Sequence, residues 1–241
     1  MIKLVNVTKR FKDKVALNKI NLDIKHGETL AIIGGSGSGK STLLRILIGL
    51  IRPTEGELWI NGQEVSGISD GEWDKVRLNM GMVFQYSALF DSMTVGENVA
   101  FGLREHKNLP EKEIQTIVKQ KLHLVGLDGV EKLMPNELSG GMKKRVGLAR
   151  AIAIEPSIIF YDEPSSGLDP VTTAKIDELI VNTQKTLNVT SVVVTHDMVS
   201  ACHIADRIAM VYEGNLVAVD SPDNFRRLDD PRIRAFFYEL R

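Results

Sequence analysis

Apolar and polar positions alternate in two N-terminal segments of the chain, residues 2–7 and 15–24. Alternation with a period of two is typical of strands that bury one face. Together with a strand at residues 57–61 they predict an antiparallel β lobe. Four other short runs are almost continuously apolar, which is typical of strands buried on both faces of a parallel sheet. These runs are residues 30–33, 82–84, 158–161 and 192–195.

Helical patterns separate the buried runs, at residues 40–50, 170–186 and 198–205. Strands that alternate with helices predict a parallel core sheet with right-handed crossovers. Between residues 94 and 153 strand patterns disappear and apolar residues recur at helical spacing, which predicts an inserted helical subdomain over about residues 87–153. We therefore expect one α/β domain over residues 1–241.

The C-terminal part is expected to contain a strand pair near residues 207–220 and a helical tail over about 221–241. Ser221-Pro222 and Asp230-Pro231 each combine a capping residue with a proline that the first helical turn tolerates. In the second tail helix the apolar residues fall on one face. This face is expected to pack either on its own subunit or across a dimer. Its residues are Ile233, Phe236, Phe237 and Leu240.

Composition narrows the possible partners. The chain carries 30 basic and 31 acidic residues, a formal charge of −1, so no overall field favours nucleic acid or anionic lipid. The single cysteine, Cys202, excludes an internal disulfide and favours a reducing compartment. No signal segment is visible, and the densest apolar run, residues 43–51, is shorter than the ~18 residues of a membrane span. We expect a soluble or peripheral protein.

A glycine-rich motif follows the buried run 30–33 and precedes a helix. It fits the pattern G-x-x-x-x-G-K-[ST], in which backbone N–H groups cradle phosphate at the positive end of the helix. The lysine is expected to reach the β- and γ-phosphates of a nucleotide, and the serine hydroxyl to bind Mg²⁺. The motif consists of Gly34, Gly35, Ser36, Gly37, Ser38, Gly39, Lys40 and Ser41, and Thr42 follows it.

Two carboxylates, Asp162 and Glu163, end the apolar run 158–161. Ligands of an open parallel sheet bind beyond the carboxyl ends of its strands, which predicts that both lie near the phosphate loop. Adjacent strand residues point to opposite sides, so we expect different roles. Asp162 is predicted to hold Mg²⁺, and Glu163 to act as general base on the attacking water.

A second candidate anion site is Ser139-Gly140-Gly141, at the start of a helical run. A serine and two glycines there can present a hydroxyl and N–H groups to one anion, although an ordinary capped helix explains them equally well. The basic run 143–145 that follows is interpreted as a solvated helix face.

With these motifs in this order, the chain resembles the ATP-binding subunits of ABC transporters over nearly its whole length. The resemblance implies a P-loop NTPase cassette with a parallel core sheet, an antiparallel β lobe and an inserted helical subdomain. It also implies ATP and Mg²⁺ as cofactors and a homodimer with two composite sites. Integral membrane permease subunits would be its partners, and its location would be cytoplasmic, on the inner face of the cell membrane.

Further site residues follow from the same resemblance. Phe11 matches the aromatic residue that stacks on adenine, and Val15 an aliphatic side chain that packs on the nucleoside. Gln85 matches the glutamine that contacts Mg²⁺ and the water, and His196 the histidine that contacts the γ-phosphate. Ser139, Gly140 and Gly141 would bind the nucleotide of the opposite subunit, and residues 166–169 match the loop that crosses to that subunit.

Two features distinguish this chain from the general family pattern. Met142 stands where the signature usually has glutamine, and activity is expected to survive because the serine and the backbone hold the phosphate. Residues 84–95, 161–164 and 229–237 resemble the ATPases of Mla-type phospholipid transporters, which work with lipid-binding MCE proteins. This resemblance implies phospholipid as cargo and an MCE-type protein as a possible partner.

The sequence is also compatible with other functions. The same ATPase could energise transport of a polar solute such as an amino acid. A soluble ABC ATPase of DNA repair or translation is less favoured, because the chain has no coiled-coil interruption, zinc cysteines or second cassette. A GTPase is disfavoured because the guanine-reading motif Asn-Lys-x-Asp is absent. Tyr86, Leu89 and Phe90 are expected to form an exposed apolar set where a helix of the membrane partner docks.

Overall fold

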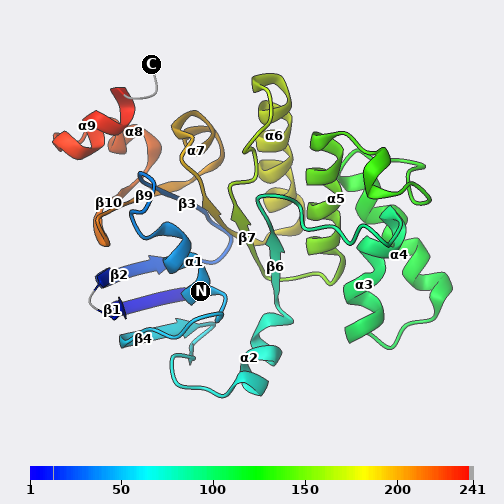
Figure 1. Ribbon diagram of the computed structural model, residues 1–241, viewed down its shortest axis with the longest axis horizontal. Coiled ribbons are helices and arrows are strands. Elements are labelled where there is room, and N and C mark those ends of the chain that lie inside the picture. Colours follow the sequence, from blue (N-terminus) through cyan, green and yellow to red (C-terminus); the bar gives the residue numbers. More distant parts are fainter. Residues whose placement is uncertain (13, 239–241) are drawn as a thin grey trace. The chain divides into compact units, whose positions relative to one another are not determined.

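The chain folds into two compact units, seen in a computed structural model that describes residues 1–12 and 14–238 (Figure 1). The first unit comprises Met1–Arg77 and Thr190–Arg241, and the second comprises Leu78–Val189. Each unit contains parallel strands and helices, and the first also contains an antiparallel sheet. The chain therefore has the α/β class that its sequence predicts.

The antiparallel sheet of the first unit has the strand order β2-β1-β4-β5. Along β1, Ile2 and Leu4 are buried at alternate positions, as the pattern predicts. An irregularity between Leu4 and Val7, where Asn6 has a φ of 51°, then shifts the alternation, so that Val7 is the next buried apolar residue. The predicted antiparallel lobe is thus confirmed. Its strands are β1 (Ile2–Phe11), β2 (Lys14–Ile24), β4 (Glu55–Ile60) and β5 (Gln63–Glu64).

A second group of strands in this unit has the order β10-β9-β3-β8. Strand β3 runs parallel to both β8 and β9, whereas β10 pairs with β9 in the antiparallel sense. Every residue of β3 and β8 is buried, which explains the apolar runs at residues 30–33 and 192–194 within them. The strands are β3 (Thr29–Ile33), β8 (Thr190–Val194), β9 (Arg207–Tyr212) and β10 (Asn215–Asp220).

One helix of the first unit, α2 (Asp70–Arg77), is not predicted from the pattern of apolar residues. Its start is a Ser69–Glu72 pair, in which the Glu72 carboxylate accepts hydrogen bonds from the Ser69 N–H and hydroxyl. Only Trp73 of this helix is buried, so no apolar stripe marks it. The other helices are α1 (Lys40–Leu47), α7 (Met198–Ile204), α8 (Pro222–Phe225) and α9 (Pro231–Tyr238).

The second unit pairs two parallel strands, β6 (Met80–Val83) and β7 (Ile158–Asp162). The predicted helical segment, residues 87–153, contains three α-helices that pack on one another, drawn in green in Figure 1, and a short 3-10 helix, Pro135–Glu137. Its limits as a subdomain stay a prediction. These helices are α3 (Val95–His106), α4 (Glu111–Leu124) and α5 (Gly140–Ala153), and α6 (Pro170–Leu187) follows β7.

Most predicted ends of helices and strands lie within three residues of the observed ones. The helix expected over residues 40–50 ends at Leu47, because Gly49 has a left-handed φ of 71° that turns the chain out of the helix. A Cβ atom at this glycine would lie 2.3 Å from the Trp73 ring, so the turn also packs closely. Phe84, expected to end a strand over residues 82–84, lies beyond the end of β6.

The C-terminal helix α9 packs on its own unit through Ile233, which is only 1% exposed. Ile233 belongs to a buried cluster with Phe225 of α8 and Met198 of α7, and Phe236 packs against the same cluster. These two residues therefore fit the expectation that the tail face packs within the subunit. The Phe237 side chain and Leu240 lie outside the described residues.

We predict that Ile233→Ala destabilises the chain by roughly 2–4 kcal/mol, because it leaves a cavity in this cluster. Thermal unfolding should show a lower Tm, while size-exclusion chromatography should show unchanged self-association. Arg234→Ala is the matched control, since its side chain is exposed and forms a surface ion pair with Asp229. An unchanged Tm together with weaker self-association would instead place this face at a subunit interface.

Candidate nucleotide-binding site

The phosphate-loop motif connects β3 to α1 through a tightly enclosed backbone. Gly34 and Gly39 have φ values of 150° and 116°, and Gly39 is the N-cap residue of α1. A Cβ atom on Gly34 would lie 2.1 Å from the Val211 carbonyl oxygen, and one on Gly39 would lie 2.8 Å from the Ala16 carbonyl oxygen. Both positions therefore require glycine.

Lys40 lies inside this loop and is only 8% exposed. Its Nζ donates to the carbonyl oxygens of Gly34 at 2.7 Å and Gly35 at 3.0 Å. The Ser38 N–H also donates to the Gly35 carbonyl, at 3.2 Å, so the loop curls around the ammonium group. Its charge adds to the positive end of the α1 dipole, which makes the loop suited to an anion.

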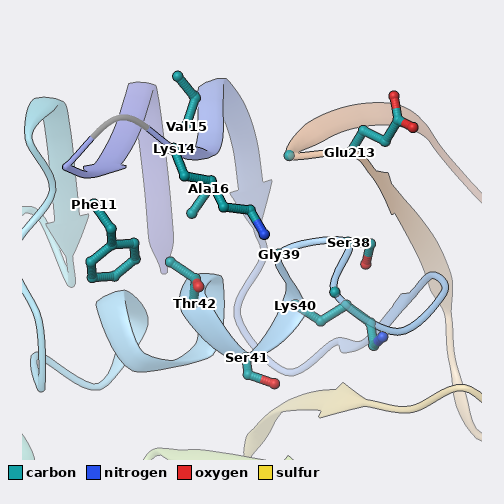
Figure 2. Close-up of a pocket in the computed structure, with 12 residues that line it drawn as sticks. Phe11, Lys14, Val15, Ala16, Ser38, Gly39, Lys40, Ser41, Thr42 and Glu213 are labelled. Atoms are coloured by element: carbon teal, nitrogen blue, oxygen red, sulfur yellow. The ribbon is translucent and has the colours of Figure 1, made fainter.

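A pocket of about 460 Å³ extends from this loop along the ends of β1 and β2. Figure 2 shows Phe11, Thr42 and Lys40 along this pocket, with Val15 and Ala16 contributed by β2. Phe11 and Val15 are 47% and 39% exposed, so both present apolar surface to it. Its lining comprises Phe11, Lys14, Val15, Ala16, Gly37, Ser38, Gly39, Lys40, Ser41, Thr42, Glu213 and Gly214.

The turn Glu213-Gly214 is a part of this pocket that the sequence analysis missed. The Gly214 N–H donates to the Ser38 carbonyl at 2.8 Å, and the Gly214 carbonyl accepts from the Asn18 N–H at 2.8 Å. Both turn residues have positive φ, 47° and 75°, as in the tight hairpin turn between β9 and β10. A glycine between two apolar strands signals such a hairpin, but its place beside the loop depends on tertiary structure.

His196 follows β8, and its side chain is exposed. The Thr195 N–H donates to the Ile32 carbonyl at 3.1 Å, so the ends of β8 and β3 are neighbours. His196 therefore emerges at the same sheet edge as the phosphate loop, as the prediction requires. Asp197 caps α7 and holds the turn after this histidine.

In the second unit, Asp162 and Glu163 lie half-buried at the end of β7. Glu163 has a left-handed φ of 47°, which is a costly conformation for a residue with a Cβ atom. Its carbonyl accepts from the Ser166 N–H at 3.2 Å, which forms a tight turn after the strand. The backbone thus reverses at the residue predicted to be the general base.

Gln85 lies at the same edge, because it follows the neighbouring parallel strand β6. Its Nε2 donates to the Ser166 hydroxyl at 3.2 Å, so the predicted glutamine and the turn after Glu163 are in direct contact. Ser87 and Ala88, further along this loop, have positive φ values of 61° and 45°.

Ser139 caps α5, since its hydroxyl accepts from the Met142 N–H at 3.3 Å. Ser139 and Gly140 are exposed, whereas Gly141 is buried and packs against α6. A Cβ atom on Gly141 would lie 2.8 Å from the Thr172 Cγ2 atom. The serine–glycine sequence therefore serves as an ordinary cap and also leaves an accessible N-terminus.

The interpretation of the basic run 143–145 as a solvated face is wrong for Lys144, which is only 7% exposed. Its ammonium donates to the main-chain carbonyls of Gln85 and Glu163. Burial lowers the pKa of Lys144, and the nearby carboxylates of Glu163 and Asp162 act in the opposite direction. Nothing in the sequence indicates this burial, because one buried residue within a polar stretch produces no periodic pattern.

The predicted site residues thus form two sets, one in each unit. Among the described residues, no cluster of three or more histidine, cysteine, aspartate or glutamate side chains could bind a metal. The predicted Mg²⁺ donors are one hydroxyl, one amide and one carboxylate, from Ser41, Gln85 and Asp162. This oxygen set fits Mg²⁺ bound mainly by nucleotide phosphates and water.

Comparison with known proteins identifies the class. A sequence model of the ABC transporter family matches residues 17–166, more than half of the chain. The chain therefore belongs to the ABC transporter family, which confirms the predicted ABC ATPase. No helix among the described residues has both the length and the apolarity that a membrane crossing needs.

Individual relatives refine this assignment. The chain is 42% identical to the intermembrane phospholipid transport system ATP-binding protein MlaF of Haemophilus influenzae, over 98% of this chain and 89% of that protein. MlaF of Escherichia coli K12 is 43% identical over 93% of this chain and 83% of its own length. The probable ribonucleotide transport ATP-binding protein mkl of Mycobacterium leprae is 42% identical, over 98% of this chain and 68% of its own.

Solved structures agree with the predicted fold. The ATP-binding cassette MJ0796, solved as a post-hydrolysis dimer with ADP and phosphate, has a TM-score of 0.84 and 37% identity, covering 92% of this chain and 99% of that one. The protein cbiO1 of Clostridium perfringens, part of a transporter complex, has a TM-score of 0.86 and 31% identity, covering 100% of this chain and 98% of that one.

We predict that Gly39→Ala destabilises the chain by several kcal/mol, because both the left-handed backbone and the Ala16 carbonyl oppose a Cβ atom. Gly35→Ala is the control, since nothing lies within 4 Å of a Cβ atom there. Thermal unfolding without nucleotide should show a large fall in Tm for the first variant alone. Equal Tm values would contradict the enclosed geometry of the loop.

Proposed function

We propose that this chain is the ATP-hydrolysing subunit of a membrane transporter that moves phospholipid, as in Mla-type systems. The observation that carries the proposal is the pocket at the phosphate loop, with a buried lysine at one end and exposed apolar side chains at the other. A nucleotide has the same polarity, with phosphates at one end and an aromatic base at the other. The phospholipid cargo rests on the relatives named MlaF.

In this proposal the first unit binds ATP. Phe11 stacks on adenine and Val15 packs against the nucleoside, since both expose apolar surface to the pocket. The loop N–H groups and Lys40 bind the β- and γ-phosphates. The loop residues are Gly34, Gly35, Ser36, Gly37, Ser38 and Gly39, and Thr42 in the first turn of α1 completes the set.

Mg²⁺ would be held by the Ser41 hydroxyl, with Asp162 and Gln85 contributing directly or through water. When bound, this ion neutralises charge on the phosphate oxygens. Ser41 is exposed at the start of α1 and Asp162 is half-buried at the end of β7, so both oxygens are accessible to a ligand. The small number of carboxylates is typical of nucleotide-bound Mg²⁺.

For hydrolysis, Glu163 accepts a proton from the water that attacks the γ-phosphate. His196 contacts the same phosphate and stabilises the charge that develops on it. The Glu163 main-chain carbonyl accepts hydrogen bonds from Ser166 and Lys144, which restricts the conformations of the base. Such preorganisation contributes to catalysis because the base needs no rearrangement during the reaction.

Two copies of the chain are proposed to bind two ATP molecules between them. Ser139, Gly140 and Gly141 would contact the nucleotide held mainly by the opposite copy. The exposed N-terminus of α5, with its serine hydroxyl, supports this role. The dimeric form of the related cassette MJ0796 supports the same assembly.

The membrane pathway would be supplied by integral membrane permease subunits, with an MCE-type lipid-binding protein as a further partner. The ATPase would then lie in the cytoplasm, on the inner face of the cell membrane. Tyr86 is 85% exposed and Phe90 is 41% exposed, whereas Leu89 is half-buried. We propose this loop as the docking surface for a permease helix.

A second candidate function keeps the ATPase and changes the cargo to a polar solute. The 42% identity to the probable ribonucleotide transport protein mkl favours it to a similar degree. Both functions require the same nucleotide chemistry, so the ATP site does not distinguish them. The cargo must be tested on the assembled transporter.

We predict that Glu163→Gln retains ATP binding and lowers turnover by ~10²–10⁴, the usual contribution of a positioned general base. Lys40→Ala should instead weaken nucleotide binding, because it removes the charge that faces the phosphates. Titration with a fluorescent ATP analogue and a phosphate-release assay measure the two effects. Turnover by Glu163→Gln at the unmodified rate would refute the general-base role.

We predict that the transporter purified with this chain carries bound phospholipid and that phospholipid stimulates its ATPase activity. Mass spectrometry of the copurified lipid and phosphate release in proteoliposomes measure this. Stimulation should be lost with Glu163→Gln. A transporter free of lipid whose activity responds to ribonucleotides or amino acids would favour the polar-solute function.

A further inference from the structure

Lys144 on α5 lies in a buried position where an ammonium group without hydrogen-bond partners would be strongly destabilising. Its side chain is 7% exposed and lies among apolar residues that include Val83, Leu148 and Ile180. Burying an ammonium group is costly unless hydrogen bonds replace its hydration. The replacement acceptors are the main-chain carbonyl oxygens of Gln85 and, at 3.4 Å, Glu163.

These contacts belong to a closed ring of hydrogen bonds. Lys144 Nζ donates to the Gln85 carbonyl, and the Gln85 side-chain Nε2 donates to the Ser166 hydroxyl at 3.2 Å. The Ser166 N–H donates to the Glu163 carbonyl at 3.2 Å, and Lys144 donates to that same carbonyl. The ring therefore connects the loop after β6, the turn after β7 and helix α5.

The same face of α5 supports the Gln85 loop at two further positions. Arg150 donates to the Ser87 carbonyl at 2.8 Å and to the Ala88 carbonyl at 2.6 Å. Between them, a Cβ atom on Gly147 would lie 3.5 Å from the Ser87 carbonyl oxygen, so the loop passes close to the helix here. Positions 144, 147 and 150 share one helix face because they are three residues apart.

Both supported segments have strained backbones. Glu163, Ser87 and Ala88 all have positive φ values, between 45° and 61°. Such conformations cost of order 1–3 kcal/mol each and persist only where surrounding contacts hold them. The carbonyls of all three residues accept hydrogen bonds from Lys144 or Arg150.

We infer that Lys144 is a positioning residue, which holds the main chain at Gln85 and Glu163 and thereby aims the proposed general base. The inference rests on the proposed function, because it acts through Glu163. Lys144 itself donates to two main-chain carbonyls, so its role is to set geometry and not to exchange a proton. Displacement of a reacting group by about 1 Å can cost ~10²-fold in rate.

The test substitutes Lys144 in the full chain, assembled with its membrane partner. Lys144→Met keeps the aliphatic stem but removes the charge and the donors. We expect kcat for ATP hydrolysis to fall by ~10–100-fold, with the KM and the dissociation constant for ATP unchanged. Lys144→Arg keeps the charge and donors and should restore most of kcat. Lys143→Met, the same change one position earlier on a half-exposed side chain, is the matched control.

A double-mutant cycle separates this inference from the proposed general base. If Lys144 acts through Glu163, Lys144→Met should have little further effect on the residual rate of Glu163→Gln. Full turnover by Glu163→Gln would refute the general base itself. A slow Glu163→Gln variant together with normal kcat for Lys144→Met would overturn only the positioning role.

Folding is monitored by thermal unfolding of each variant. If Lys144→Met does not fold, Lys144→Gln and Lys144→Arg provide the comparison, and kcat should be lower for the neutral glutamine at equal Tm. Equal kcat values for these two variants would overturn the inference. Failure of all three variants to fold would also overturn it, because Lys144 would then be a determinant of folding alone.

Discussion

The close approach of main-chain carbonyls to the phosphate loop is the constraint on which the first unit depends. The Val211 carbonyl occupies the space beside Gly34, and the Ala16 carbonyl occupies the space beside Gly39. These carbonyls belong to β9 and β2, so both sheets of the unit fix the loop before any ligand is bound. A loop held in this way presents its N–H groups without the entropy cost of ordering them.

In the second unit, side chains hold the backbone of the functional turns in place. Its two strained turns, at Glu163 and at Ser87, follow neighbouring parallel strands and contact one helix face. Lys144 and Arg150 on that face bind carbonyls rather than carboxylates, so their charges hold backbone geometry. Because Ser139 caps α5, the same helix that fixes these turns also presents the proposed contact to a second nucleotide.

Sequence patterns predicted the strands and the chemical motifs well because both are determined by residues that are close together in the chain. Continuous apolar runs indicated β3, β7 and β8, and the glycine–lysine spacing indicated the phosphate loop. Features that depend on tertiary packing were missed. Helix α2 buries only Trp73, Glu213 reaches the pocket from a distant hairpin, and Lys144 is buried within a run of charges. A periodic sequence pattern cannot reveal a single residue whose position depends on tertiary packing.

Similar identity to proteins named for phospholipid and for ribonucleotide transport has a physical explanation. Binding and hydrolysing ATP imposes the same geometry whatever is transported, so the ATP site does not distinguish one cargo from another. In the proposed docking loop, Tyr86 is 85% exposed while the adjacent Ser87 is 3% exposed, with its carbonyl held by Arg150. An exposed aromatic side chain on a fixed backbone loses little entropy on binding and is typical of interface anchors. Under the proposed function, this loop would select the membrane partner, and the partner would select the cargo.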